Sequence, residues 1–332
     1  MKTILRNVLL LVSVLAVGLT SCKKEESQNF LEENFISIEN ALYHSGTFPE
    51  STTDERLSGI EMSDQVMNGA INYITVTTYY EISKFYIGIN GVSGYLEYRP
   101  ENSGTSSYKI YIIPLMISQN FSSNVELILS ALLDNGFVTI PSKYPLYKLD
   151  TRPGALEVKL AFSNNKDIDL HLFTPSGKHI CYWTSEDGFY YGENGNFAYP
   201  FGLDIDSNAG CDIDGINKEN IYIPEEYVEN GIYTVAVDLY QNCYPSIPTS
   251  WSVTARYNGN MISPATGKNP ASGVFEVGAK SSYEENLIEV MTFKISGAKQ
   301  SRSVLDPSDS NAVKKSDLKI SDSPKVTLRR AM

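Results

Sequence analysis

The sequence predicts an all-β chain that contains two β-sandwich domains. Residues 35–296 form short runs rich in Tyr, Ile, Val and Thr, which are common in strands. Turn residues interrupt these runs at short intervals, and this spacing is typical of a sandwich. The chain has 332 residues, which corresponds to about two domains. The turn segment Asp150–Gly154 is the best boundary, so we place the domains at residues 34–152 and 153–297.

Residues 1–21 have the pattern of a secretion signal peptide. Lys2 and Arg6 make the start of the chain positive, and a largely apolar run of 12 residues, Val8–Leu19, follows. This run is shorter than the roughly 20 residues of a membrane-spanning helix. It ends in Leu19-Thr20-Ser21-Cys22, which resembles the lipobox of bacterial lipoproteins. The resemblance implies cleavage before Cys22 and a lipid, palmitate included, on that residue; the alternative is an ordinary signal peptide.

Residues 22–33 are expected to form a lipidated tether. Lys23-Lys24-Glu25-Glu26 resembles the charged export signals of Bacteroidota lipoproteins, although two lysines precede the acids. The resemblance implies a lipid anchor in the outer membrane, with the protein either periplasmic or exposed at the surface. The alternative is a solvated linker. No other segment has 18 consecutive apolar residues, so the lipid is the expected attachment to the membrane.

Residues 298–332 are expected to form a disordered basic tail. From Lys299 onward the chain has eight basic residues, four acids, seven serines and no aromatic residue. A segment of this composition buries too little apolar surface to order itself. A solvated tail is the first interpretation, and docking on the acidic body or on an anionic surface is the alternative.

The first domain is expected to consist of strands joined by short turns. β-branched and aromatic residues make Ile74–Tyr80 a poor helix, and period-2 alternation is clear in Phe85–Ile89. Asn124–Leu133 fits neither period cleanly, so a helix is the alternative there. Pro114 would confine its strand to a sheet edge or a bulge. The expected strands are Ile74–Tyr80, Phe85–Ile89 in a hairpin with Tyr95–Tyr98, Lys109–Ile117 and Asn124–Leu133.

In the second domain, Asp167–Leu172 alternates strictly between polar and apolar residues. One face would therefore join the core, and the face with Asp167, Asp169 and His171 would be exposed. A turn follows, after which His179–Trp183 can return as the hairpin partner. One interpretation is that His171 and the two aspartates form a metal site or a catalytic base. The first interpretation is that His171 is an ordinary surface histidine.

The segment Leu203–Ile221 is rich in oxygen ligands. Five of its 19 residues are acids and three are asparagines, with one lysine to offset the charge. Ca²⁺ takes about six to eight oxygen ligands, so a calcium site built from strand ends and a loop is one interpretation. The segment lacks the glycine and the closing glutamate of an EF-hand. The alternative is an acidic surface loop whose side chains cap their own backbone. The candidate ligands are Asp204, Asp206, Asn208 and Asp212, with Asp167 and Asp169 from the preceding strand.

An ordered series of motifs in the second domain resembles the YfaP-like β-sandwich domains of bacterial envelope proteins. The series is Asp-Ile-Asp-Leu-His-Leu (167–172), Leu-Asp-Ile-Asp-Ser-Asn-Ala-Gly-Cys (203–211), Gly-Ile-Asn-Lys-Glu-Asn-Ile (215–221) and Gly-Ile-Tyr-Thr-Val-Ala-Val-Asp (231–238). A looser similarity is to bacterial pre-peptidase C-terminal domains. The resemblance covers about 145 residues and implies a jelly-roll-like sandwich with no established catalytic role. The resemblance marks five family-like positions, Asp167, Asp169, Asp204, Asp206 and Asn208. It does not assign a metal to them.

The predicted fold class is therefore all-β, with two β-sandwich (Ig-like or jelly-roll-like) domains. They follow a lipoprotein signal peptide and precede a disordered C-terminal tail. The first domain resembles no family that we recognise.

Three cysteines remain once Cys22 is assigned to lipid. An oxidising compartment allows one disulfide among Cys181, Cys211 and Cys243. We favour Cys211–Cys243, because Cys211 lies in the acidic segment and Cys243 follows the expected strand Tyr233–Tyr240. Cys181 lies within a strand and would be a buried thiol, although its pairing with either partner stays open.

Aromatic residues crowd the stretch before the acidic segment. The chain has 22 tyrosines, and aromatic residues mix with glycines between Tyr182 and Phe201, which predicts a loop. Exposed aromatic rings stack on sugars and anchor protein interfaces, whereas the alternative is that they pack on the sandwich. The candidate partners are a glycan and an envelope protein. The candidate ligand-binding residues are Trp183, Tyr190, Tyr191, Phe197 and Tyr199.

The predicted function is non-catalytic binding or adhesion at the cell envelope, with Ca²⁺ as a stabilising ion. The net charge of −12 argues against nucleic acid as a partner, because phosphate binding needs a basic face. The chain has three histidines and none of the common nucleophile-elbow, zinc-protease or phosphate-loop motifs. The alternatives are a structural subunit of a surface assembly or envelope scaffold, and a hydrolase with paired acids.

Overall fold

The computed structural model describes residues 30–100, 108–182 and 201–299 and the backbones of three short strands, β14 (Phe189–Gly192), β15 (Gly195–Ala198) and β24 (Arg329–Arg330). Within this part of the chain the helical elements are α1 (Phe30–Asn34), η1 (Ala209–Cys211) and η2 (Glu225–Tyr227), and the other elements are strands. The predicted all-β class is confirmed. None of the described helices has the length and hydropathy needed to span a bilayer. Cys22, the signal peptide, the tether up to residue 29 and most of the tail lie outside the described residues.

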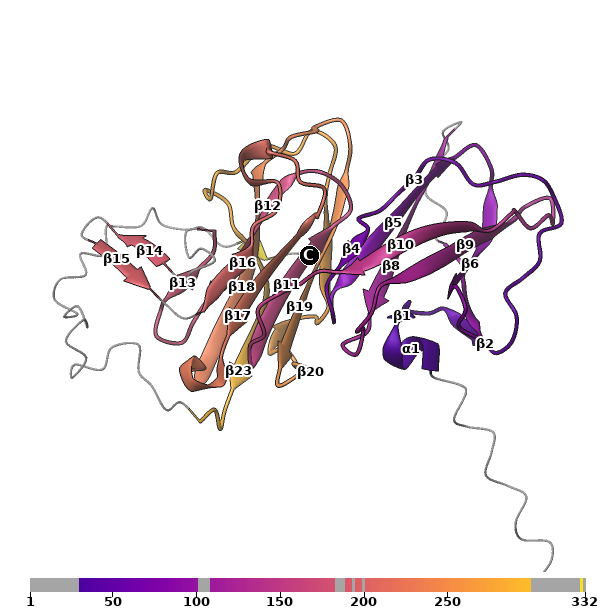
Figure 1. The fold of residues 1–332 in the computed structure, drawn as a ribbon. Coiled ribbons are helices and arrows are strands. Elements are labelled where there is room, and N and C mark those ends of the chain that lie inside the picture. The colour runs from indigo at the N-terminus through magenta and orange to yellow at the C-terminus, as the bar shows by residue number, and fades with distance from the viewer. Residues whose placement is uncertain are drawn as a thin grey trace, which may run out of the picture.

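The first sandwich, residues 30–148, consists of two sheets that share one apolar core (Figure 1). Neighbouring strands in these sheets are antiparallel, except that β10 and β4 are parallel. The core takes Ile74 and Ile113 from the four-stranded sheet and Phe85 and Leu129 from the six-stranded sheet. The smaller sheet has the order β1 (Ile36–Ser37), β8 (Lys109–Ile117), β5 (Ile71–Thr78), β3 (Ile60–Glu61). The larger has the order β2 (Leu42–His44), β7 (Tyr95–Tyr98), β6 (Ile82–Ile89), β9 (Val125–Leu133), β10 (Ser142–Lys148), β4 (Gln65–Val66).

The strands predicted in this half are present. β6 and β7 pair as the expected hairpin, with Ile87 opposite Leu96. Val125–Leu133 is a strand rather than a helix, because pairing with both β6 and β10 satisfies its backbone on two sides. Pro114 is paired with Tyr73 of β5. On its other side, β8 pairs with β1 only at Met116 and Ile117, so within the described residues Pro114 has no partner strand there. The missing N–H of the proline therefore lies where β8 has a partner on one side only.

The second sandwich, residues 155–298, is also built from two sheets around one core (Figure 1). The first has the order β16 (Gly202–Ile205), β17 (Lys218–Ile223), β11 (Leu156–Phe162), β19 (Thr249–Tyr257), β20 (Asn260–Met261), and β22 (Ala271–Phe275) pairs with β19. The second has the order β13 (His179–Ile180), β12 (Asp167–Phe173), β18 (Gly231–Gln241), β23 (Ile288–Ile295), β21 (Thr266–Gly267), and β24 pairs with β23. The strands β14 and β15 form a separate hairpin.

Both faces of β12 are buried, and the predicted exposure of its polar face is wrong. The apolar side chains of β12 lie in the core as expected. On the other face, Asp167, Asp169 and His171 are at most 3% exposed. The loop between β16 and β17 covers the start of this face: Gly210 N–H donates to Asp167 Oδ2 over 2.8 Å, and Asn208 Nδ2 donates to the Lys166 carbonyl over 3.0 Å. A period-2 pattern separates two faces, but it does not show that a distant loop covers the polar one.

Buried polar contacts join the two sandwiches. β5 lies beside β11 and β19. The Lys159 ammonium group donates to the Asn68 carbonyl over 2.9 Å, and the Thr254 hydroxyl donates to the Gly69 carbonyl over 3.1 Å. Tyr73 is buried at the same junction, and this burial raises its pKa to about 12.

Candidate metal centre

Four carboxyl groups gather where β12 meets β17, and we call them the carboxylate cluster: Asp167, Asp169, Asp206 and Glu219. One oxygen each from Asp169, Asp206 and Glu219 lies within 4.8 Å of the other two. Asp169 is on β12, Glu219 is on β17 of the opposite sheet, and Asp206 directly follows β16. Asp167 lies two residues before Asp169 on the same face of β12. Asp167 and Glu219 are each 1% exposed. Asp206 is exposed, so the cluster is open to solvent on one side.

Hydrogen bonds hold these acids in place. The Leu170 N–H donates to Glu219 Oε2 over 2.6 Å and thereby links β12 to β17. The loop after β16 is shaped by Asn208, which has a left-handed φ of 61°. Its Oδ1 accepts from the Asp214 N–H over 3.1 Å, and its Nδ2 donates to Asn217 over 2.9 Å. This loop places the Gly210 N–H on Asp167.

The cluster accumulates negative charge that hydrogen bonds offset only in part. Burial raises the pKa of Asp167 to about 6, with further contributions from the charges of Asp206 and Asp238. Burial and the neighbouring acids also raise the pKa values of Asp169 and Glu219 well above their usual range. Glu219 Oε1 is buried and has no hydrogen-bond partner. The acids that approach it are themselves acceptors when ionised, so either protons or a cation must compensate the charge.

The basic residues beside the cluster are engaged elsewhere. Lys166 precedes Asp167 in the chain, but its ammonium group donates to Asn242 Oδ1 and to the Tyr244 carbonyl. Lys218 precedes Glu219 and donates to the Ile216 carbonyl over 2.9 Å. The ion pairs within the described residues include no member of the cluster. Within the described residues, no lysine or arginine therefore forms an ion pair with these acids.

Of the six predicted ligands, the structure brings together Asp167, Asp169 and Asp206. Asp204 lies outside the cluster, because its carboxylate accepts from the Arg152 N–H over 2.5 Å and from Asn220 Nδ2 over 2.6 Å. The pairing of β16 with β17 shifts register between Leu203 and Ile205, and this bulge places the side chains of Asp204 and Asp206 in different surroundings.

The other two predicted ligands also lie outside. The Asn208 side chain is used to hold its own loop, and Asp212 is exposed. The sequence prediction missed Glu219, although it was one of the five acids counted in the segment. The only sequence signal for it is an acid within the buried strand β17.

The predicted Cys211–Cys243 disulfide is confirmed, with Cα atoms 5.7 Å apart. Cys211 ends η1 and Cys243 follows β18, so the bond ties the loop over Asp167 to the sheet that contains β12. Cys181 is a buried thiol outside this disulfide, as expected.

The predicted aromatic surface is described only in part. The backbones of Tyr190, Tyr191 and Phe197 belong to the β14–β15 hairpin rather than to an irregular loop. Figure 1 shows this hairpin beside the second sandwich, on the side away from the first. The five candidate side chains, Trp183 and Tyr199 included, lie outside the described residues. Phe201, at the end of the stretch, belongs to the core.

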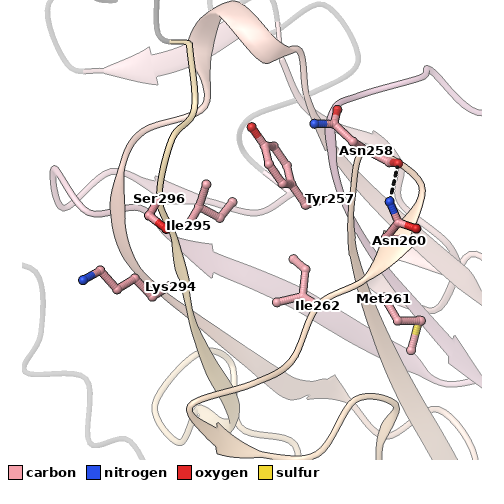
Figure 2. A pocket seen from close by; sticks show the side chains of 8 residues that line it. All are labelled: Tyr257, Asn258, Asn260, Met261, Ile262, Lys294, Ile295 and Ser296. Carbon is pink, nitrogen blue, oxygen red and sulfur yellow. Dashed lines mark hydrogen bonds between the residues drawn. The ribbon is translucent and has the colours of Figure 1, made fainter.

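The second sandwich also has two surface hollows. One of about 400 Å³ is lined by residues 257, 258, 260–262 and 294–296, and Figure 2 shows Tyr257 and Ile262 beside it. Its lining has amides, aliphatic groups and Lys294, but no acid, and none of the predicted site residues. The other, of about 600 Å³, includes Asp238, which pairs across the strands with Asp169. Neither hollow contains a member of the carboxylate cluster.

Comparisons with known proteins give little further information. No family model matches the chain, and no relative was found among curated proteins. Among solved structures, fibronectin(III)-like modules of Clostridium thermocellum CbhA are similar, with 10% identity over 55% of this chain and 86% of theirs, at a TM-score of 0.19. A TM-score this low supports no argument about function, and the architecture rests on the sheets described above.

Proposed function

We propose that the protein is a non-catalytic binding module of the bacterial cell envelope, anchored to the outer membrane by lipid on Cys22, and that Ca²⁺ stabilises its second sandwich. The observation that carries the calcium proposal is the buried Glu219 oxygen, which has no hydrogen-bond partner and lies among other carboxylates. Hard cations such as Ca²⁺ prefer carboxylate, carbonyl and water oxygens. The cluster offers four carboxylates, and its open side leaves room for water.

A cation in this cluster would act as a structural clamp. It would connect Asp169 on β12, Glu219 on β17 and Asp206 after β16. The β14–β15 hairpin lies between β13 and β16 in the chain, so Asp206 stands close to the C-terminal end of the hairpin segment. Fixing this end reduces the conformational freedom that the segment loses when it binds a partner.

We further propose that this segment presents the ligand-binding aromatic residues. The residues are Trp183, Tyr190, Tyr191, Phe197 and Tyr199, and the partner is a glycan or an envelope protein. The proposal is supported by the projecting position of the hairpin in Figure 1 and by the aromatic content of the segment.

Isothermal titration with Ca²⁺ tests the calcium part. The protein is the chain from Lys23 to Met332 after treatment with EDTA. We expect saturable binding in the wild type and a loss of at least tenfold in affinity in Glu219→Gln, because that variant keeps the shape and removes one charge. Asp212→Asn is the matched control, since Asp212 is an exposed acid of the same loop. Equal affinities in all three proteins would overturn the proposal.

Binding to a panel of bacterial surface polysaccharides and to immobilised outer-membrane vesicles tests the aromatic part. We expect the double variant Tyr190→Ala, Tyr191→Ala to lose binding, and EDTA to weaken binding of the wild type. Tyr79→Ala is the control, because Tyr79 is a 68% exposed tyrosine of the first sandwich. Unchanged binding by the double variant would contradict the assignment of this surface.

A further inference from the structure

A second group of ligand atoms lies at the other end of the polar face of β12. It consists of His171 on β12, His179 on β13 and Cys181 just after β13, and one atom from each lies within 4.8 Å of the others. The hairpin register explains the grouping. Phe173 pairs with His179 and Leu172 with Ile180, so the next pair in this register is His171 with Cys181. Side chains at paired and alternate positions share a face of a hairpin.

The His171 ring has a nitrogen that the described residues leave without a hydrogen-bond partner. His171 Nδ1 and His179 Nε2 are 2.9 Å apart, so one ring donates a proton to the other. The His171 ring is fully buried, and its Nε2 has no hydrogen-bond partner. If Nδ1 carries the proton, Nε2 is a buried lone pair without a donor. If His179 carries the proton, Nε2–H is a buried donor without an acceptor. Either tautomer leaves one polar atom unsatisfied, which costs stability.

We infer that His171, His179 and Cys181 form a binding site for a transition-metal ion of the Zn²⁺ type, with one nitrogen from each imidazole and the cysteine sulfur as ligands. Zn–N bonds are about 2.0–2.1 Å and Zn–S bonds about 2.3 Å, so ligand atoms of a tetrahedral site lie roughly 3.3–3.6 Å apart. One ligand atom from each of the three residues lies within 4.8 Å of the other two, which is close enough for a shared ion. Three protein ligands leave the fourth position for water.

The ligands would be two neutral imidazoles and one thiolate. Burial lowers the pKa of His171 well below its usual range and that of His179 to about 4, so both rings are neutral ligands near neutral pH. Zn²⁺ binding would convert the Cys181 thiol to a thiolate and release its proton to solvent. The resulting site has one net positive charge and lies two residues along β12 from Asp169.

The chemistry of the ligands separates this site from the carboxylate cluster. Imidazole and thiolate ligands select Zn²⁺, Co²⁺ and similar ions, whereas an all-oxygen set selects Ca²⁺. The inference therefore does not depend on the proposed calcium function, and one protein can be tested for both.

Absorption spectroscopy with Co²⁺, a substitute for Zn²⁺, tests the inference. The protein is the chain from Lys23 to Met332, treated with EDTA and with its disulfide intact. We expect a thiolate-to-Co²⁺ charge-transfer band at one ion per chain, and its loss when Zn²⁺ is added in equal amount. Cys181→Ser should abolish the band, and His179→Gln should weaken Co²⁺ binding at least tenfold. His44→Gln is the control, because His44 lies in the first sandwich beside Glu97.

Further measurements keep the outcome decisive. Asp206→Asn should retain the Co²⁺ band while losing Ca²⁺ binding, so failure of one proposal is distinguishable from failure of the other. If Cys181→Ser does not fold, a Zn²⁺-dependent rise in the unfolding midpoint of the wild type, absent with Mg²⁺, supports the site. Absence of the charge-transfer band in the wild type, or its persistence in Cys181→Ser, overturns it.

Discussion

The substitution Asp169→Asn should change stability in opposite directions with and without Ca²⁺. At the 4.8 Å limit of the cluster and an effective dielectric constant of about 20, two unit charges repel by roughly 3.5 kcal/mol. The metal-free cluster avoids part of this repulsion by keeping protons, because the pKa of Asp169 is raised. Asparagine has nearly the same shape and no charge. We therefore expect the variant to be more stable than the wild type in EDTA, by about 1–3 kcal/mol near neutral pH.

Calcium should reverse this order. An ion that binds only the folded state adds about 2.7 kcal/mol at a concentration one hundred times its dissociation constant. The wild type gains this stability, and the variant loses most of it with the missing carboxylate. Thermal unfolding in EDTA and in excess Ca²⁺ measures both effects. Asp212→Asn, which removes an exposed charge, should shift stability by less than about 0.5 kcal/mol in either condition.

The same experiment can refute the reasoning. A loss of stability in Asp169→Asn of the same size in EDTA and in Ca²⁺ would mean that Asp169 is an ordinary hydrogen-bonded residue. It would also mean that charge repulsion within the cluster is not the dominant effect.

Three further predictions concern pH, the disulfide and the junction. In EDTA the free energy of unfolding should fall as pH rises from about 4 through 6. The reason is that folded Asp167, with a pKa of about 6, holds a proton that the unfolded chain has released. Urea unfolding at several pH values measures this fall, and a rise over the same interval would contradict the prediction. Replacing both Cys211 and Cys243, 32 residues apart, by serine should lower the free energy of unfolding in urea by up to about 4 kcal/mol. It should also weaken Ca²⁺ binding, since the loop over Asp167 is released. Unchanged Ca²⁺ affinity would argue against a role of the disulfide in holding this loop. Gly69→Ala, at a φ of 68° and with a new Cβ that meets Gln119 Oε1 and lies 2.5 Å from Arg256 Nε, should destabilise the chain by about 1–3 kcal/mol. Gly91→Ala has a similar φ and open space, so an equal loss there would show that strain, not the contact at the junction, is responsible.

Local pattern predicted much of the fold, because alternation is a property of a single strand. It identified β6, β7, β8 and β9, and it placed the apolar side of β12 in the core. It could not predict the burial of Asp167, because the covering loop comes from residues about 40 positions away and is held by hydrogen bonds to Asn208. The displacement of Asp204 depends on a single bulge in β16, and no periodicity rule reports a bulge.

The sequence predicted the chemical type of the candidate site, but not which residues form it. An excess of acids indicated a cation, whereas the choice of ligands depends on which strands of the two sheets meet. Glu219 joins the cluster because β17 and β12, on opposite sheets, approach closely enough for the Leu170 N–H to reach its carboxylate. That approach is a tertiary property, so a single sequence gives no direct sign of it.

The position of the two proposed ion sites on β12 suggests what they are for. Alternate residues of one buried face supply Asp167 and Asp169 to the first site and His171 to the second. One further ligand of each site lies near an end of one chain segment: Cys181 stands where the chain leaves β13, and Asp206 stands where it has just passed β16. The β14–β15 hairpin lies between these two residues in the chain. Two ions would therefore bind residues that flank the segment with the proposed aromatic contacts.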